Sequence, residues 1–186
     1  MGPSDPLLQQ ILRRLILRSF PTLRRRQIRI CWGAEDELLY CATEDGQYTI
    51  AVNNALQGAG RRVLEGGIAH ELCHIEADLQ LGSYQRQLAW ERYARSRWAR
   101  MREERVAEQR VIELGYGAHL LELIRFTRRL GYSFEREHGL SYVEVLRAEA
   151  LRTPIQRRKG VIARFCGLPR HISCMEKTAW EKDVPV

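Results

Sequence analysis

The sequence predicts an α+β fold, in which a small antiparallel sheet lies beside a long buried helix and the remainder is mainly helical. The sheet is predicted by three short segments rich in β-branched and aromatic residues, QIRICWG, ELLYCAT and QYTIAVN. The turn-like sequences AEDE and EDG separate them, as expected of strands joined by short loops. Further along the chain, long tracts place apolar residues at helical spacing.

Four helices are expected beyond the strands. The first spans about 63–81 and is ended by a glycine. The tract 84–114 contains neither Gly nor Pro, and its residues favour helix. Two further helical patterns follow at 119–132 and 141–151, with Ser141 as the expected cap of the second.

The chain of 186 residues has the length of one compact domain, so residues 1–186 are expected to form a single unit. The N-terminal segment, about 5–20, places Leu and Ile at amphipathic spacing with arginines between them. Such a helix packs on a core, whereas a membrane span needs about twenty nearly uncharged residues. The less regular stretch at about 154–186 is expected to be a C-terminal extension.

Charge and cysteine content restrict the setting more than the function. Thirty Lys and Arg residues against 23 Asp and Glu give a formal net charge of +7, which is compatible with nucleic acid, an anionic membrane surface or an acidic protein partner. The five cysteines form no CxxC pair, and the odd count favours reduced thiols over a disulfide framework. The sequence therefore predicts a cytoplasmic protein without a transmembrane segment, and it leaves the oligomeric state open.

The segment HELCH, residues 70–74, carries the strongest chemical signal. Residues four apart lie one turn apart on the same side of a helix, so His70 and His74 are expected to point toward one position. Two imidazoles placed in this way are typical ligands of a tetrahedral Zn²⁺. Glu71 is expected to be the catalytic general base that takes a proton from a zinc-activated water. The alternative is an ordinary amphipathic helix whose histidines have structural partners.

A second motif supplies an acidic residue for a third ligand. The segment EERVAE places Glu104, Ala107 and Glu108 in an E-x-x-A-E pattern. Together the two motifs resemble the gluzincin pattern, HExxH followed by ExxA and then Asp or Asn, which is found in HtpX-like endopeptidases and, with variations, in the ImmA/IrrE family. The resemblance covers residues 70 to about 117. It implies a zincin-like fold, a supporting role for Glu108, and Zn²⁺ held by His70, His74 and Glu104.

Simple helix counting favours a different acidic residue. If the helix at 84–114 returned directly alongside the first one, Glu91 would be level with the histidines and Glu104 would lie beyond them. Glu91 also begins an E-x-x-A stretch. The motif favours Glu104, which requires a longer or bent connection between the two helices.

These motifs predict a zinc-dependent endopeptidase of the gluzincin type, acting on a peptide or protein substrate. The segment QYTIAVNN is the expected sheet edge, on which substrate backbone adds as an extra strand. Four residues are candidates for stabilising the oxyanion, and residue type alone does not choose among them. They are Tyr116, His119, His138 and Tyr142.

Two other functions fit the same residues. A nucleic-acid-associated protease resembling the SprT group would suit the basic chain, with His119 as the nearest candidate for its third histidine. A non-catalytic regulatory or binding module on a zincin scaffold would keep the ligands without turnover.

Overall fold

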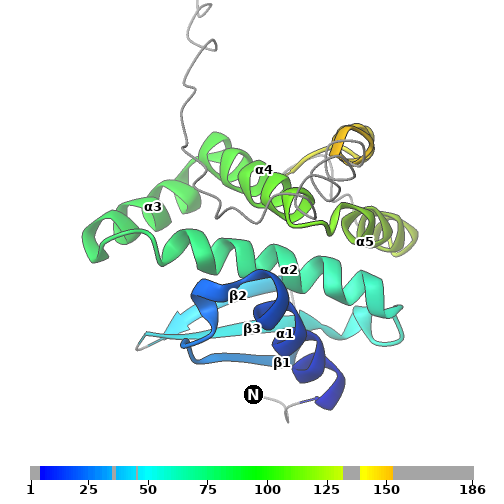
Figure 1. The fold of residues 1–186 in the computed structure, drawn as a ribbon. Coiled ribbons are helices and arrows are strands. Elements are labelled where there is room, and N and C mark those ends of the chain that lie inside the picture. Colours follow the sequence, from blue (N-terminus) through cyan, green and yellow to red (C-terminus); the bar gives the residue numbers. More distant parts are fainter. Residues whose placement is uncertain (1–4, 35–36, 45, 132–138, 153–186) are drawn as a thin grey trace, which may run out of the picture. The chain divides into compact units, whose positions relative to one another are not determined.

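The computed structural model describes residues 5–34, 37–44, 46–131 and 139–152, and these have an α+β fold (Figure 1). The α+β class predicted from the sequence is therefore confirmed. The expected C-terminal extension lies outside the described residues. In chain order the elements are α1 (Pro6–Ser19), the 3-10 turn η1 (Pro21–Leu23), β1 (Ile28–Ala34), β2 (Leu39–Glu44), β3 (Gln47–Asn53), the 3-10 turn η2 (Asn54–Leu56), α2 (Arg61–Asp78), α3 (Ser83–Arg95), α4 (Arg97–Glu113), α5 (Gly117–Arg129) and a further helix at 142–152.

The N-terminal helix α1 is held by a cap and by one apolar face. The Asp5 carboxylate accepts hydrogen bonds from the backbone N–H groups of Leu7 and Leu8 at 2.8 and 3.1 Å, and these donors have no partner within the helix. The same side chain accepts a bond from Trp32 Nε1 on β1. The buried face of α1 packs against α2 and β1. None of the described helices has both the length and the apolar composition needed to cross a membrane.

β3 is the central strand of the sheet, which has the order β1-β3-β2. β2 and β3 are antiparallel, and Gly46 in the turn between them has φ 76°, a backbone conformation that favours glycine. β1 and β3 are parallel, so the prediction of an antiparallel sheet is wrong for this pair. After β1 the chain continues into β2, which lies at the opposite edge of the sheet. Because β3 then returns antiparallel to β2, it runs in the same direction as β1.

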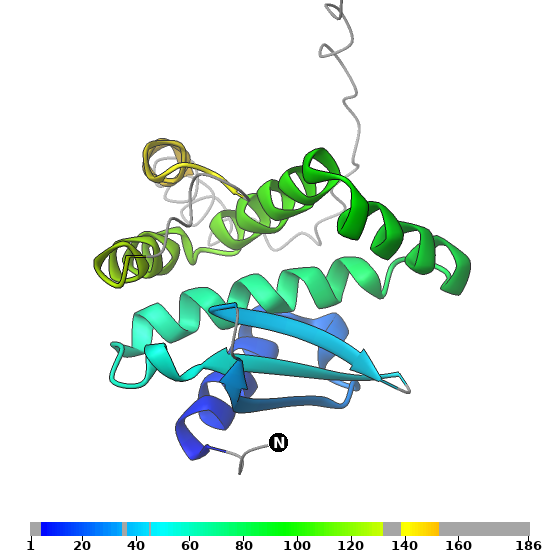
Figure 2. The same cartoon turned by 180° about the vertical axis from the view of Figure 1, so that it is seen from behind.

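The strand order also changes the expected substrate edge. β3 is buried along most of its length, including Ile50 and Val52, because it has a neighbouring strand on each side. The prediction that QYTIAVNN forms a sheet edge is therefore wrong. β2 is an edge strand and packs against α2, and Figure 2 shows it as the strand nearest to that helix.

The helix α2 lies between two groups of elements, with the sheet and α1 on one side and α4 and α5 on the other (Figures 1 and 2). Two adjacent glycines permit these close approaches. A Cβ on Gly66 would meet the backbone oxygen of His119 on α5 at 2.7 Å, and a Cβ on Gly67 would meet Leu39 Cδ1 on β2 at 2.8 Å. The glycine pair therefore lets α2 contact α5 and the sheet at the same level, and most of its side chains are buried.

The tract expected to be helical over 84–114 forms two helices. α3 ends at Arg95, Ser96 is extended with φ −121° and ψ 113°, and α4 begins at Arg97. The Ser96 hydroxyl accepts a hydrogen bond from Ala99 N at 3.2 Å, so a serine cap starts the second helix without Gly or Pro. The tract is therefore helical as expected, and its division at Ser96 is the bent connection that a Glu104 ligand requires. The break lets α4 pack against both α3 and α2.

Candidate metal centre

The side chains of His70 and His74 lie one turn apart on α2 and face the same position. Their Nε2 atoms are 3.0 Å apart, and their ring centroids are 4.7 Å apart. His70 is buried, and His74 is partly exposed. Because α2 is packed on several sides, the two rings are held by a strongly constrained element of the fold.

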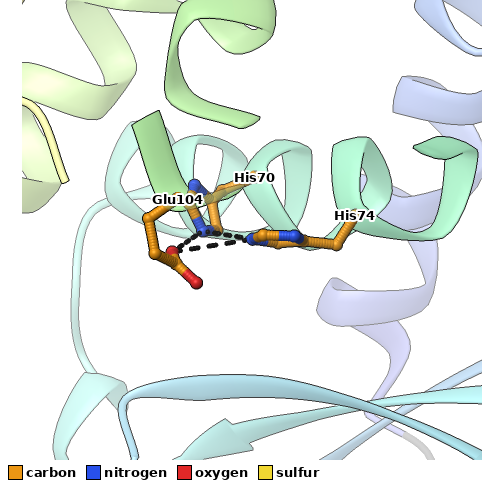
Figure 3. A group of neighbouring side chains, drawn as sticks. All are labelled: His70, His74 and Glu104. Carbon is orange, nitrogen blue, oxygen red and sulfur yellow. Dashed lines mark hydrogen bonds and ion pairs between the residues drawn. The ribbon is translucent and has the colours of Figure 1, made fainter. Parts of the chain in front are cut away.

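Glu104 on α4 completes a group of three donor atoms, which can hold a metal ion (Figure 3). Its Oε2 atom lies 3.0 Å from His70 Nε2 and 3.6 Å from His74 Nε2. Figure 3 shows the carboxylate and both rings directed toward one another from two helices. Glu91 lies on α3, is exposed and is not part of the group. The break at Ser96 therefore brings Glu104, and not Glu91, to the histidines.

The three donor atoms have the spacing that a tetrahedral metal ion requires. The circle through them has a radius of about 1.9 Å, close to zinc–nitrogen and zinc–oxygen distances of about 2.0–2.2 Å. His70 Nε2 faces both an imidazole nitrogen and a carboxylate oxygen but carries at most one hydrogen, so it cannot donate a separate hydrogen bond to each. Two imidazoles and one carboxylate form a donor set that suits Zn²⁺.

The charges of the three ligand residues are linked. Burial lowers the pKa of His70, but the hydrogen bond and the negative charge of Glu104 outweigh it and raise the pKa to about 9. Burial raises the pKa of Glu104, but its hydrogen bonds with the two histidines outweigh that effect and lower the pKa below its usual range. Since metal ligands must be deprotonated, a metal ion and a proton compete for this group.

Glu71 follows His70 on α2 and is buried. Burial raises the pKa of its carboxyl group, and the nearby charges of His70 and His74 oppose this shift without cancelling it. The Glu104 carboxylate accepts a hydrogen bond from the Tyr93 hydroxyl. Among the described residues, no such hydrogen bond is donated to the Glu71 carboxylate. A buried carboxylate with a raised pKa has the properties of a general base.

Tyr93 on α3 belongs to the site, although the sequence did not indicate it. Its hydroxyl donates a hydrogen bond to Glu104 Oε1 at 2.6 Å, which leaves Oε2 directed toward the histidines. Burial, and next the charge of Glu104, raise the pKa of Tyr93 above its usual range, so the phenol remains a donor. Tyr93 lies within ERYA, the E-x-x-A stretch that begins with Glu91. No local pattern shows that it reaches a residue on the next helix.

Glu108 lies one turn after Glu104 on α4 and is fully buried. It accepts a hydrogen bond from Leu140 N, and a Cβ on Gly139 would overlap its carboxylate, so the backbone at these positions closes around it. Burial raises the pKa of Glu108 to about 7, against the lowering effect of the His70 charge. Glu108 Oε1 and His70 Nδ1 are both buried without a hydrogen-bond partner among the described residues. The two atoms are therefore not hydrogen-bonded to each other, so a supporting role for Glu108 toward His70 stays a prediction.

The other residues considered from the sequence lie outside the group. His119 on α5 has its Nε2 atom 3.2 Å from Glu65 Oε2, so this candidate for the third histidine of a SprT-like site is not part of the group. The Tyr116 hydroxyl is hydrogen-bonded to a serine of α1 at 2.9 Å, and the Tyr142 hydroxyl accepts a bond from an arginine of α5. His138 lies outside the described residues. The structure therefore gives no geometric support to the described oxyanion candidates.

No protein-family model matches this chain, and no curated protein or solved structure matches it either. What the described residues offer toward a function is therefore the geometry of His70, His74 and Glu104.

Proposed function

We propose that this protein is a zinc-dependent peptidase. The observation that carries the proposal is the convergence of three donor atoms, separated by 3.0, 3.0 and 3.6 Å, beside a buried glutamate. Three protein ligands leave one position of a tetrahedron open, which is the arrangement of catalytic zinc sites rather than structural ones. In this proposal His70, His74 and Glu104 hold the ion, and Glu71 performs the proton transfers.

The chemistry is divided between the ion and the chain. When bound, Zn²⁺ supplies Lewis-acid polarisation of a peptide carbonyl and lowers the pKa of a water molecule. Glu71 accepts a proton from the attacking water and then donates it to the amine nitrogen as the C–N bond breaks. The raised pKa of Glu71 suits both steps. A carboxyl group whose pKa is closer to neutral pH takes up a proton more readily than an ordinary glutamate and can still release it. Tyr93 holds the Glu104 carboxylate in position.

The substrate in this proposal is an extended peptide that lies along β2. β2 is an edge strand next to α2, and most of its residues are exposed. An extended chain can add to such an edge through main-chain hydrogen bonds, which recognise backbone and make few demands on sequence. This geometry favours unfolded or flexible protein segments over folded domains as substrates.

Metal content and cleavage together test the proposal. Purified protein is expected to bind one zinc per chain, and a variant with both His70→Ala and His74→Ala is expected to lose it. Glu71→Gln should keep the zinc and lose cleavage of a fluorogenic peptide library and of an unfolded protein such as casein. Zinc binding without cleavage of any substrate by the wild type would favour a non-catalytic binding module. Unchanged zinc content in the double histidine variant would exclude the site altogether.

A further inference from the structure

The bend between α3 and α4 exposes three large aromatic side chains. We call this surface the elbow and define it as residues 83–102. Tyr84, Trp90 and Trp98 are 72%, 51% and 78% exposed, although burial of a tryptophan is strongly favourable. α3 has no buried residue at all, so Tyr84 and Trp90 are not the outer edge of a core. Three large aromatic rings exposed within one short segment of the chain are candidates for an interaction site.

The same segment carries exposed arginines. Arg92, Arg95, Arg97 and Arg102 are exposed, and in the described part of the chain no carboxylate lies within ion-pair distance of any of them. Trp98 and Arg102 are four residues apart on α4, so they lie on the same side of that helix. The elbow therefore combines aromatic faces with unpaired guanidinium groups.

We propose that the elbow binds single-stranded nucleic acid. Such ligands carry two groups that complement the elbow: a phosphate backbone that binds the arginines and exposed base faces that stack on the aromatic rings. Arginine serves this purpose well, because the guanidinium group binds phosphate through two donors and stacks on bases. The proposal is independent of the peptidase activity, since none of these residues is a ligand of the metal centre.

The chemistry of the elbow argues against three other occupants. In a duplex the bases are stacked on one another, so aromatic rings on a convex helical surface do not reach their faces. A membrane-bound helix needs a continuous aliphatic face, whereas Val106, just beyond the elbow, is the nearest exposed aliphatic residue of α4. The C-terminal segment 153–186 is itself rich in Arg and Lys, so its charge does not complement the elbow.

The elbow is in direct contact with the candidate metal centre. Tyr93 lies within it, and its hydroxyl contacts the ligand residue Glu104. The Arg100 guanidinium lies over the Tyr93 ring at 5.6 Å from its centroid. A nucleic acid strand held on the elbow would thus lie close to the metal centre, and proteins bound to the same strand would be brought near a peptidase site.

Fluorescence anisotropy with a labelled oligodeoxythymidine tests the inference on full-length Glu71→Gln protein. We expect binding at low salt, and each of Trp90→Ala and Trp98→Ala should weaken it by about 5- to 150-fold, the range for loss of one stacked base. A variant with glutamine at Arg92, Arg95, Arg97 and Arg102 should reduce the slope of log K against log salt by roughly 3. The matched control replaces four exposed arginines of the α1 side, Arg13, Arg18, Arg25 and Arg26, by glutamine and should bind nearly as well as the parent.

Zinc content and the thermal unfolding midpoint must stay unchanged in the elbow variants, so that loss of binding cannot be attributed to unfolding. If Trp90→Ala proves unstable, Trp98→Ala alone decides, because its ring is the most exposed. The inference is overturned if the oligonucleotide does not bind at low salt, or if the α1-side control weakens binding as much as the elbow variants do. Preference for a duplex of the same length, or for vesicles containing phosphatidylserine, would also overturn it.

Discussion

The two helices that form the candidate metal centre differ sharply in how they are held. α2, which carries both histidines, is buried on nearly all sides and contacts α1, α4, α5 and the sheet. The chain that delivers Glu104 passes through α3, which has no buried residue, and only from Glu104 onward does α4 enter the core. Glu104 is therefore the first buried residue of its helix, at the boundary between an exposed segment and an anchored one.

The two parts of the site are therefore positioned in different ways. The spacing of the histidines follows from one helix turn and needs no long-range contact. The placement of Glu104 depends on the Ser96 cap, on Tyr93 and on the packing of the later turns of α4. Variants in the packing surface of α2 should therefore act on folding, whereas variants around α3 should act on metal affinity.

The largest expected effect comes from the third ligand. Glu104→Gln removes the anionic donor and should reduce zinc affinity by more than the roughly 10–100-fold seen when a residue outside the ligand set is lost. Glu91→Gln is the matched control, since Glu91 lies on exposed α3 and outside the group. Competition with a zinc-binding dye measures both. If Glu91→Gln lost zinc and Glu104→Gln retained it, the assignment of the third ligand would be reversed.

The next effect concerns the packing of α2. Gly66→Ala places a Cβ 2.7 Å from the backbone oxygen of His119, so α2 and α5 must separate. We expect the free energy of unfolding to fall by about 1–3 kcal/mol, although alanine is the better helix former by about 1 kcal/mol. Ala94→Leu on exposed α3 adds more atoms and should change stability by less than about 0.5 kcal/mol.

Urea unfolding of both variants measures this contrast between the two helices. Equal stability of the Gly66→Ala protein and the wild type would mean that α2 and α5 are less tightly packed than their backbone contact indicates.

A smaller effect is expected at Tyr93. Tyr93→Phe removes the hydrogen bond to Glu104 Oε1 and keeps the ring, so zinc affinity should fall by about 10–100-fold. Tyr84→Phe is the control, because Tyr84 is exposed on the same helix. Isothermal titration with Zn²⁺ separates this role from a purely catalytic one. Loss of cleavage with unchanged zinc affinity would show that Tyr93 acts on substrate instead.

The same contrast explains what the sequence could predict. The α+β class and the approximate course of α2 follow from local periodicity, and His70 and His74 are brought together by helix spacing alone. The break at Ser96 was not predictable from breaker residues, because it has neither Gly nor Pro and depends on one serine hydroxyl. Tyr93 could not be identified because its contact crosses that break.

The strand order was missed for a related reason. Period-two patterns identify strands but do not specify which strand lies between two others. The prediction of antiparallel pairing was correct for β2 and β3, which a tight turn joins, and wrong for β1 and β3, which are distant in sequence. The available signal in the sequence was the apolar run from Ile50 to Val52, because a strand that is covered on both faces lacks the alternation of apolar and polar residues.

The smallest effect tests the anchored end of α4 through pH. Glu144 and Ser141 form a capping box at the start of the helix at 142–152: Glu144 Oε2 accepts from Ser141 N at 2.7 Å, and Ser141 Oγ accepts from Glu144 N at 3.2 Å. Arg105 on α4 also donates to Glu144, and these hydrogen bonds, that from Arg105 first, lower its pKa to about 2.

A depressed carboxyl pKa means that the unfolded chain binds the proton more readily than the folded protein does. The stabilisation by Glu144 should therefore be complete above the ordinary glutamate pKa of about 4.5 and should be lost as the pH falls from there toward about 2. Because Glu144 is 40% exposed, solvent screening keeps the contribution below about 1 kcal/mol. Urea unfolding of wild type and Glu144→Gln across the acid range should show their stability difference shrinking with falling pH. A difference that stayed constant or grew would mean that α4 is anchored to this helix by packing and not by the Arg105–Glu144 pair.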